Sequence, residues 1–340
     1  MSAADSQPNA IAADSAKVVA ADPSNVVAAD STHVIAPNST NVIPAKAGIS
    51  DFGRTENEVA PPTRVPPVAA WTRLLASELR LIFGRRRNQV GLATLFGLVV
   101  LVGVALKVSS LRHPGSTGGD LMSAVAGNGL FLGFAGLSIE MALFLPLAVS
   151  VLAGDAIAGE ANQGTLRYLL LAPVSRVRLL VMKATSLAIG ALVGAFVVAA
   201  GGLVTGIVLF GARPLTTLSG TSIGIADGLW RLALAVLYLA CGLTALAMIG
   251  LFISTLTEQP LAATVGTAMV GTLLWILDAV PQLDWLHPWL LVDRWPAFID
   301  LLRDPVFTDR LVAGLWVDAA YAAAFFALAW LRFRRADITS

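Results

Sequence analysis

The chain has 340 residues, of which 56% are hydrophobic and 13% charged, and its mean hydropathy is +0.75. Soluble domains carry about 25% charged residues, so this composition excludes an ordinary soluble domain and is typical of a membrane protein. The formal net charge of +1 is uninformative by itself, and no nucleic-acid partner is expected. The single cysteine, Cys241, excludes an intrachain disulfide and a cysteine-based metal site.

Residues 1–66 are predicted to form a disordered, low-complexity tail. Between residues 13 and 44 an eight-residue unit recurs, first as Ala-Asp-Ser-Ala-Lys-Val-Val-Ala. Stacked repeats need units of about 20–50 residues, so this repeat does not predict a folded domain. The tail lacks a basic segment followed by an apolar core, which argues against a signal peptide. Prolines are expected to close it as a stiff linker: Pro61, Pro62, Pro66 and Pro67.

Residues 67–87 are predicted to contain an amphipathic helix that lies in the membrane interface. Its apolar residues recur at helical spacing, at positions 71, 74, 75, 79, 82 and 83. Arg73, Glu78 and Arg80 fall largely on the opposite face of this helix. The run of arginines at 85–87 then marks a membrane boundary.

Six transmembrane helices are predicted within residues 88–340, because about 20 apolar residues suffice to cross a bilayer. The second span ends near 153 and begins within 130–138; the others lie at about 89–107, 184–210, 231–254, 261–280 and 311–331. The apolar stretch 121–153 is too long for one simple span. Its glycines are expected to separate off a short element: Gly127, Gly129, Gly133 and Gly136. The predicted fold class is an all-α polytopic membrane protein with six transmembrane helices, an amphipathic helix before them and a disordered tail.

The distribution of lysine and arginine sets the expected orientation. On the side of the amphipathic helix lie twelve such residues: Arg73, Arg80, Arg85, Arg86, Arg87, Arg167, Arg176, Arg178, Lys183, Arg332, Arg334 and Arg335. On the other side lie seven: Lys107, Arg112, Arg213, Arg231, Arg294, Arg303 and Arg310. The positive-inside rule therefore predicts that both termini and the connector at 154–183 face the cytoplasm.

Two further patterns concern packing and the outer surface. The pairs Gly190/Gly194 and Gly202/Gly206 in the third span allow close helix approach, and packing within the chain is favoured over a seam between two copies.

The outer loop, 281–309, is expected to form short helices at the outer leaflet, as an interfacial anchor or an outer gate. Its tryptophans carry this expectation: Trp285, Trp289 and Trp295.

Two carboxylates, Glu140 and Asp318, fall within apolar spans, and Asp278 lies near the end of another. A charge at the bilayer centre is costly, so such residues face a cavity or a partner. One interpretation is that Glu140 and Asp318 line a translocation path. The other is that they form ion pairs with Arg231 or Arg310 that hold helices together. The sequence favours neither interpretation.

The connector at 154–183 concentrates charge in a short segment. Asp155 and Glu160 lie at the inner end of the second span, and Gly164, after Gln163, allows a turn. Thr165 is a suitable cap for two helical turns that end at Pro173, with three leucines on one face: Leu166, Leu169 and Leu170. Ser175 is a suitable cap for the next helix, which carries Arg176, Arg178 and Lys183 into the third span. A short apolar face bracketed by charge fits a groove on a partner protein, whereas a solvated loop does not need leucines at this spacing.

These connector residues resemble the signature of permeases of the ABC-2 (type-2 ATP-binding cassette exporter) family. The similarity is carried by Glu160, Gly164, Thr165, Leu166, Leu169, Leu170, Pro173, Ser175, Arg176 and Lys183. The amphipathic helix with Glu78-Leu79, the six spans and the closing segment 333–338 are also similar to that family. The resemblance covers roughly residues 68–340 and leaves out the tail.

The resemblance implies that the chain is an exporter permease whose 160–176 connector couples to a separate ATPase subunit. By position, Asp155 and Glu160 lead into the coupling element, Gly164 to Leu170 form it, and the return is made by Pro173, Ser175, Arg176 and Lys183. No Gly-x-x-x-x-Gly-Lys-Ser/Thr loop occurs in the chain, so ATP and Mg²⁺ are expected on the partner. No cofactor or catalytic residue is expected here. A second permease copy or homologue in the cell membrane is also implied.

Three other classes of protein compete with this interpretation. A secondary transporter would show repeated halves with paired broken helices, and none is evident. An intramembrane enzyme would need a nucleophile with a base, or a metal cluster, at one depth. Glu140 and Asp318 are a candidate acidic pair, but neither has a supporting motif. The histidines, His33, His113 and His287, lack metal-ligand spacing, so no metal site is expected. A membrane scaffold would explain the spans but not the connector.

Overall fold

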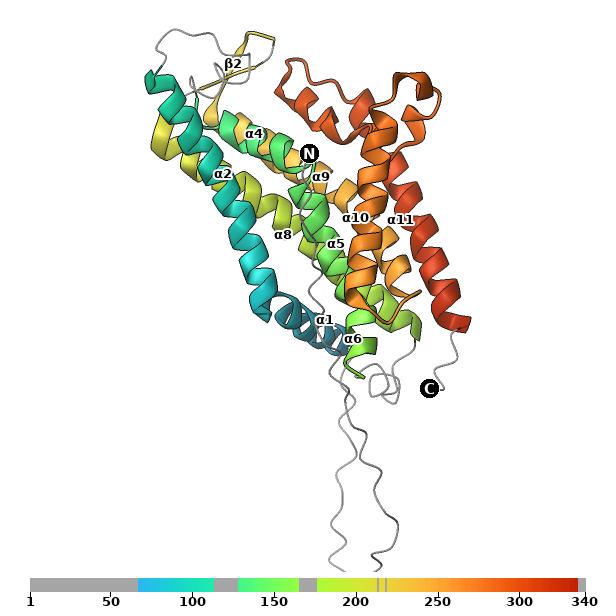
Figure 1. Cartoon of the computed structure of the whole chain (residues 1–340). Coiled ribbons are helices and arrows are strands. Elements are labelled where there is room, and N and C mark those ends of the chain that lie inside the picture. Colours follow the sequence, from blue (N-terminus) through green and yellow to red (C-terminus); the bar gives the residue numbers. More distant parts are fainter. Residues whose placement is uncertain (1–66, 113–127, 165–175, 213, 218, 336–340) are drawn as a thin grey trace, which may run out of the picture. The chain divides into compact units, whose positions relative to one another are not determined.

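Helices account for nearly all of the regular structure (Figure 1). The computed structural model describes residues 67–112, 128–164, 176–212, 214–217 and 219–335; the predicted tail at 1–66 lies outside them. The α-helices and strands are α1 (Pro67–Gly84), α2 (Arg86–Arg112), α4 (Phe131–Glu140), α5 (Phe144–Ala156), α6 (Ala158–Asn162), α8 (Arg176–Phe210), β1 (Leu215–Thr216), β2 (Ser222–Ile223), α9 (Ile225–Ser254), α10 (Pro260–Asp278) and α11 (Asp309–Arg335).

In the part of the chain that the structure describes, five helices are long and apolar enough to cross a membrane: α2, α8, α9, α10 and α11. The pair α4 and α5 adds a sixth span when the two are counted together. The predicted all-α polytopic fold is therefore confirmed. The observed helices extend further than hydropathy placed them, since α8 begins at Arg176 and α9 at Ile225. Polar residues at membrane surfaces continue a helix as long as its backbone hydrogen bonds continue.

The second span is a broken helix, with α4 and α5 meeting at an angle of 58°. The expected short element is present as α4, but the break that separates it from α5 follows Glu140, whereas the described glycines lie before or inside α4. Pro146 supplies the physical reason. In a continuous helix its ring would clash with the carbonyl of Ala142, which would also lose its N–H partner, whereas the first turn of α5 tolerates a proline.

The helix α9 lies at the centre of the bundle. Of its most apolar 18-residue window, 72% is buried, against 17% for the windows of α2, α10 and α11. The contacts of α9 are mainly with α11, α8 and α5. Large areas of α2, α10 and α11 are therefore left for contact with lipid or with other chains.

Close packing of α8 against α4 depends on glycine. A Cβ atom added at Gly202 would lie 2.6 Å from the carbonyl oxygen of Leu132 and 2.8 Å from the Cα of Gly133. One at Gly206 would overlap the backbone of Gly129. The favoured interpretation of these glycines, packing within the chain, is confirmed.

The outer loop folds into short 3-10 helices, η1 (Pro281–Leu283), η2 (His287–Trp289) and η3 (Trp295–Leu302), as predicted. Its tryptophans divide into two groups. Trp285 and Trp289 are 72% and 70% exposed, which suits an interfacial position. Trp295 is buried and packs edge-on against Trp275, with ring centroids 6.2 Å apart. Trp295 therefore anchors the loop to the bundle and does not rest on the membrane surface.

The glycine contact generates a prediction about stability. Gly202→Ala should lower the free energy of unfolding by about 1–3 kcal/mol, the usual cost of overpacking, because the backbone of α4 must move. The matched control is Gly97→Ala in α2, where an added Cβ meets nothing within 4 Å and alanine is the better helix former. Thermal unfolding of both variants in detergent measures the difference. Equal melting temperatures would contradict the backbone contact.

Candidate functional site

The corner between α1 and α2 is held by side chains of the second helix. The side-chain amide of Asn88 donates a hydrogen bond to the Ile82 carbonyl at 2.8 Å, and that of Gln89 donates to the Phe83 carbonyl at 2.9 Å. The last carbonyls of a helix lack partners within it, so these two bonds satisfy groups that the turn at Gly84 would leave free. These two hydrogen bonds therefore fix the angle between α1 and α2.

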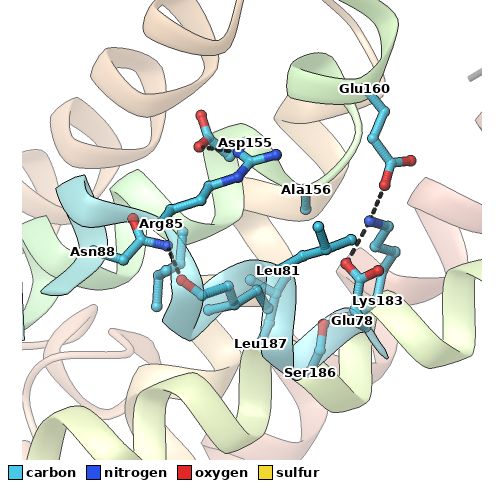
Figure 2. Close-up of a pocket in the computed structure, with 12 residues that line it drawn as sticks. Glu78, Leu81, Arg85, Asn88, Asp155, Ala156, Glu160, Lys183, Ser186 and Leu187 are labelled. Carbon is cyan, nitrogen blue, oxygen red and sulfur yellow. Dashed lines mark hydrogen bonds and ion pairs between the residues drawn. The ribbon is translucent and has the colours of Figure 1, made fainter. Parts of the chain in front are cut away.

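Lys183 is the central residue of a buried ionic cluster (Figure 2). Its ammonium group lies 2.5 Å from the Oε1 atom of Glu78 on α1 and also contacts Oε1 of Glu160 on α6. Lys183 is 4% exposed and Glu78 is 8% exposed. One cation therefore joins the amphipathic helix, the start of the connector and the first turns of α8.

The second part of the cluster surrounds Asp155 at the end of α5. Its Oδ2 atom lies 3.0 Å from Arg85, and Arg87 contacts the same oxygen. Together with the lysine pairings, three carboxylates meet three cations among the described residues, so the formal charges of these six groups cancel. Neutrality lowers the cost of placing six charged groups at the edge of an apolar bundle.

The charge of Glu160 depends on its neighbour. Burial raises the pKa of Glu160, and the ammonium of Lys183 beside it opposes that rise. Replacing Lys183 with a neutral residue would remove this opposition and leave the pKa of Glu160 higher still. The ion pair with Lys183 therefore stabilises the charged form of Glu160.

Ser254, the last residue of α9, holds the turn between α5 and α6. Its hydroxyl oxygen accepts hydrogen bonds from the backbone N–H groups of Ile157 and Ala158, at 3.1 and 2.9 Å, and donates to the carbonyl of Gly154 at 3.0 Å. Ser254 is completely buried. Three backbone groups at the start of the connector thus have one side chain as their partner.

The other end of the connector is tied to the end of α11. The guanidinium of Arg176 donates to the backbone carbonyls of Phe333 and Arg334, at 3.3 and 3.4 Å. A cation at the carbonyl end of a helix is favoured by the helix dipole as well as by these bonds. Arg176 therefore joins α8 to α11 where the connector returns to the bundle.

The structure brings some predicted site residues together and leaves others untested. Asp155, Glu160 and Lys183 lie in the cluster, and Gly164 has a φ of +67°, which glycine adopts without strain. The remaining predicted coupling residues lie outside the described part of the chain: Thr165, Leu166, Leu169, Leu170, Pro173 and Ser175. Their role stays a prediction.

Sequence reasoning missed four members of the site: Glu78, Arg85, Arg87 and Ser254. The placement of Glu78 on the polar face of α1 is wrong, because the residue is buried. Its spacing offered a signal, since positions 71, 74, 75, 78 and 82 share one helical face. Ser254 offered none, because a serine at the end of an apolar span is common.

The two intramembrane carboxylates form no ion pair with the predicted arginines. Arg231 donates to the carbonyls of Leu301 and Arg303, and Arg310 pairs with Asp300. The ion-pair interpretation of Glu140 and Asp318 is therefore wrong. Within the described residues both oxygens of Glu140 and the Oδ2 atom of Asp318 are buried without a hydrogen-bond partner.

A third acidic residue lies close to a histidine. Each of three side chains, Asp278, His287 and Asp293, has one atom that could bind a metal ion, and these three atoms lie within 4.8 Å of one another. The sequence spacing did not indicate this group. The Nε2 atom of His287 also lies 3.2 Å from the carbonyl oxygen of Val280. The contact between His287 and Val280 joins the outer loop to the residues just after α10.

Comparison with known families gives one match. A family model described as "ABC-2 family transporter protein" matches residues 3–283. The connector motifs led us to expect the resemblance over 68–340, so the match differs at both ends. It includes the tail and stops before α11. None of the curated proteins matches the chain.

Lys183→Met should be strongly destabilising, because it leaves two buried carboxylates without their cation. Removing one partner of a buried ion pair costs about 3–5 kcal/mol of the free energy of unfolding. The control is Arg86→Met, an exposed arginine next to the cluster. Adding Glu78→Gln and Glu160→Gln to Lys183→Met should restore part of the loss. The measurement is thermal unfolding in detergent; a Lys183→Met variant as stable as Arg86→Met would refute the cluster.

Proposed function

Because the chain belongs to the ABC-2 family of transporter proteins, and so is a permease subunit of an ATP-binding cassette transporter, we propose that it is an exporter driven through the connector at 160–176. The ATPase is a separate subunit, which also holds the ATP and Mg²⁺. The connector receives the movement of that subunit and passes it to the spans. One observation carries this proposal, namely the buried cluster around Lys183 at the base of the connector.

The cluster favours transmission of force over a loose tether. Glu160 lies at the start of the 160–176 connector and Lys183 lies seven residues after its end, so their ion pair closes the base of the connector. The pairing with Glu78 adds the amphipathic helix to the same unit. A push on the connector therefore reaches α1, α5 and α8 together.

Two further contacts extend this path. Ser254 links the start of the connector to α9, and Arg176 links its end to α11. Buried hydrogen-bonded groups resist separation because an unmade bond costs about 1–3 kcal/mol. Movement at the connector would then reach both the centre of the bundle and its last helix.

The proposal fixes an orientation and an assembly. ATP is cytoplasmic, so a connector that binds an ATPase faces the cytoplasm, in agreement with the excess of lysine and arginine on that side. Both termini then lie in the cytoplasm and the outer loop on the far side of the cell membrane. The substrate leaves between two permease subunits, copies or homologues, for which α2 and α10 have large unburied apolar faces.

A pull-down from native membranes tests the partner. A stoichiometric soluble ATPase should come with the chain, and Leu166→Asp should abolish the association. The matched control is Leu256→Asp, an exposed leucine between α9 and α10 that lies outside the proposed coupling element. A chain that purifies without any ATPase, or loses it equally in both variants, would refute coupling through the connector.

Uncoupling tests the transmission itself. Glu160→Gln and Arg176→Gln should leave the ATPase bound and active but remove the effect of ATP on hydrogen exchange in α5, α8 and α11. The reason is that each replacement loosens one charged link between the connector and the spans. Arg86→Gln is the control for a nearby arginine that belongs to neither link. An unchanged response to ATP in both test variants would contradict the mechanism.

A further inference from the structure

A groove runs along the side of the bundle where α8 and α11 both pack against α9 but hardly touch each other. Its volume is about 590 Å³. Small-molecule sites usually have volumes of about 300–1,000 Å³. The groove is therefore large enough for an organic molecule of ordinary size.

The lining of the groove is almost entirely apolar. It comprises Thr185, Ala188, Ile189, Leu192, Leu237, Ala240, Cys241, Thr244, Leu315, Asp318, Ala319 and Ala322. Asp318 is the only charged residue among them. The hydroxyls of Thr185 and Thr244 donate to carbonyls of their own helices, at 2.8 and 2.7 Å. Little polar chemistry therefore remains in the groove apart from the carboxylate.

Among the described residues Asp318 has no partner for its charge. The residue is 4% exposed, and its Oδ2 atom has no hydrogen-bond partner among the described residues. Neighbouring polar groups are engaged elsewhere: Tyr238 donates to the carbonyl of Arg294 at 2.7 Å, and Arg310 pairs with Asp300. An unpaired carboxylate in an apolar span is costly, and such residues tend to serve a ligand or a pathway.

The position along the helices places the groove inside the membrane. Asp318 lies nine residues after the start of α11 at Asp309, or about 13 Å at 1.5 Å per residue. Cys241 lies sixteen residues after the start of α9 at Ile225, or about 24 Å. Exposed side chains on all three helices border the groove, namely Leu192, Leu237 and Leu315. A ligand would therefore reach the groove from the lipid.

We propose that this groove is a binding site for a lipophilic organic cation, whose charged group pairs with Asp318 and whose apolar body lies between α8 and α11. Charge complementarity selects a cation, because the groove offers one carboxylate and no cationic residue. Binding here does not need the ATPase. Only the further statement that such cations are the exported substrate class rests on the proposed function.

Binding of tetraphenylphosphonium to the purified chain, without any ATPase, tests the site. Asp318→Asn should weaken binding about tenfold or more, since an ion pair in surroundings with an effective dielectric constant of about 20 is worth at least a factor of ten. Asp318→Glu should keep most of the affinity. The control is Asp309→Asn, which removes an exposed carboxylate from the first turn of the same helix. Thermal unfolding of Asp318→Asn, expected at or above the normal temperature, verifies that it folds.

Cys241 localises the ligand, because it lines the groove and is the only cysteine of the chain. Tetraphenylphosphonium should slow alkylation of Cys241, and tetraphenylborate, an anion of the same shape, should not. Ala188→Phe should fill the groove and abolish the protection.

Three outcomes would overturn the proposal. The first is equal tetraphenylphosphonium affinity for Asp318→Asn and the unaltered chain. The second is equal protection of Cys241 by the cation and the anion, as expected of a groove that accepts any acyl chain. The third is a Cys241 that is protected without ligand, because a second copy covers it. None of these outcomes bears on the pull-down of the ATPase, so the two proposals can fail separately.

Discussion

The burial of Lys183 between two carboxylates is the constraint on which the inner end of this bundle depends. A buried ammonium group is tolerated only when its neighbours supply the charge and hydrogen bonds that water would have given. Glu78 and Glu160 supply them from two different elements, α1 and α6. The position of the amphipathic helix and the path of the connector are therefore not independent. Each must be in place for the other to be stable.

The same requirement explains why the connector is fastened to several spans. Buried backbone groups at the α5–α6 turn need partners, and Ser254 of α9 supplies them. The free carbonyls at the end of α11 accept hydrogen bonds from Arg176. Satisfying these groups joins the two ends of the connector to helices that are distant in sequence. Local chemistry thus links the connector to distant helices, as the proposed coupling requires.

Hydropathy and helical periodicity predicted the six spans and the amphipathic helix, because a bilayer demands continuous apolar length and internal backbone hydrogen bonds. They misplaced the break in the second span. The break was expected at the flexible glycines, whereas the steric effect of Pro146 places it after Glu140. The sequence predicted only some members of the ionic cluster around Lys183. Asp155, Glu160 and Lys183 belong to a recognisable connector, but their partners Glu78, Arg85 and Arg87 lie about 70–105 residues away in sequence. Pairing over such separations follows from tertiary packing, which a single sequence does not specify.

The contrast between Lys183 and Asp318 bears on function. Both are buried charged residues in helices that cross the membrane. The lysine has two protein partners and so contributes to the structure of the bundle. The aspartate has none among the described residues and faces a groove whose other side chains carry no charge. The fold pairs the buried charges at the connector with one another. Among the described residues it leaves Asp318 without such a pair, at a cost in stability. That cost is recovered when a cation enters the groove from the lipid.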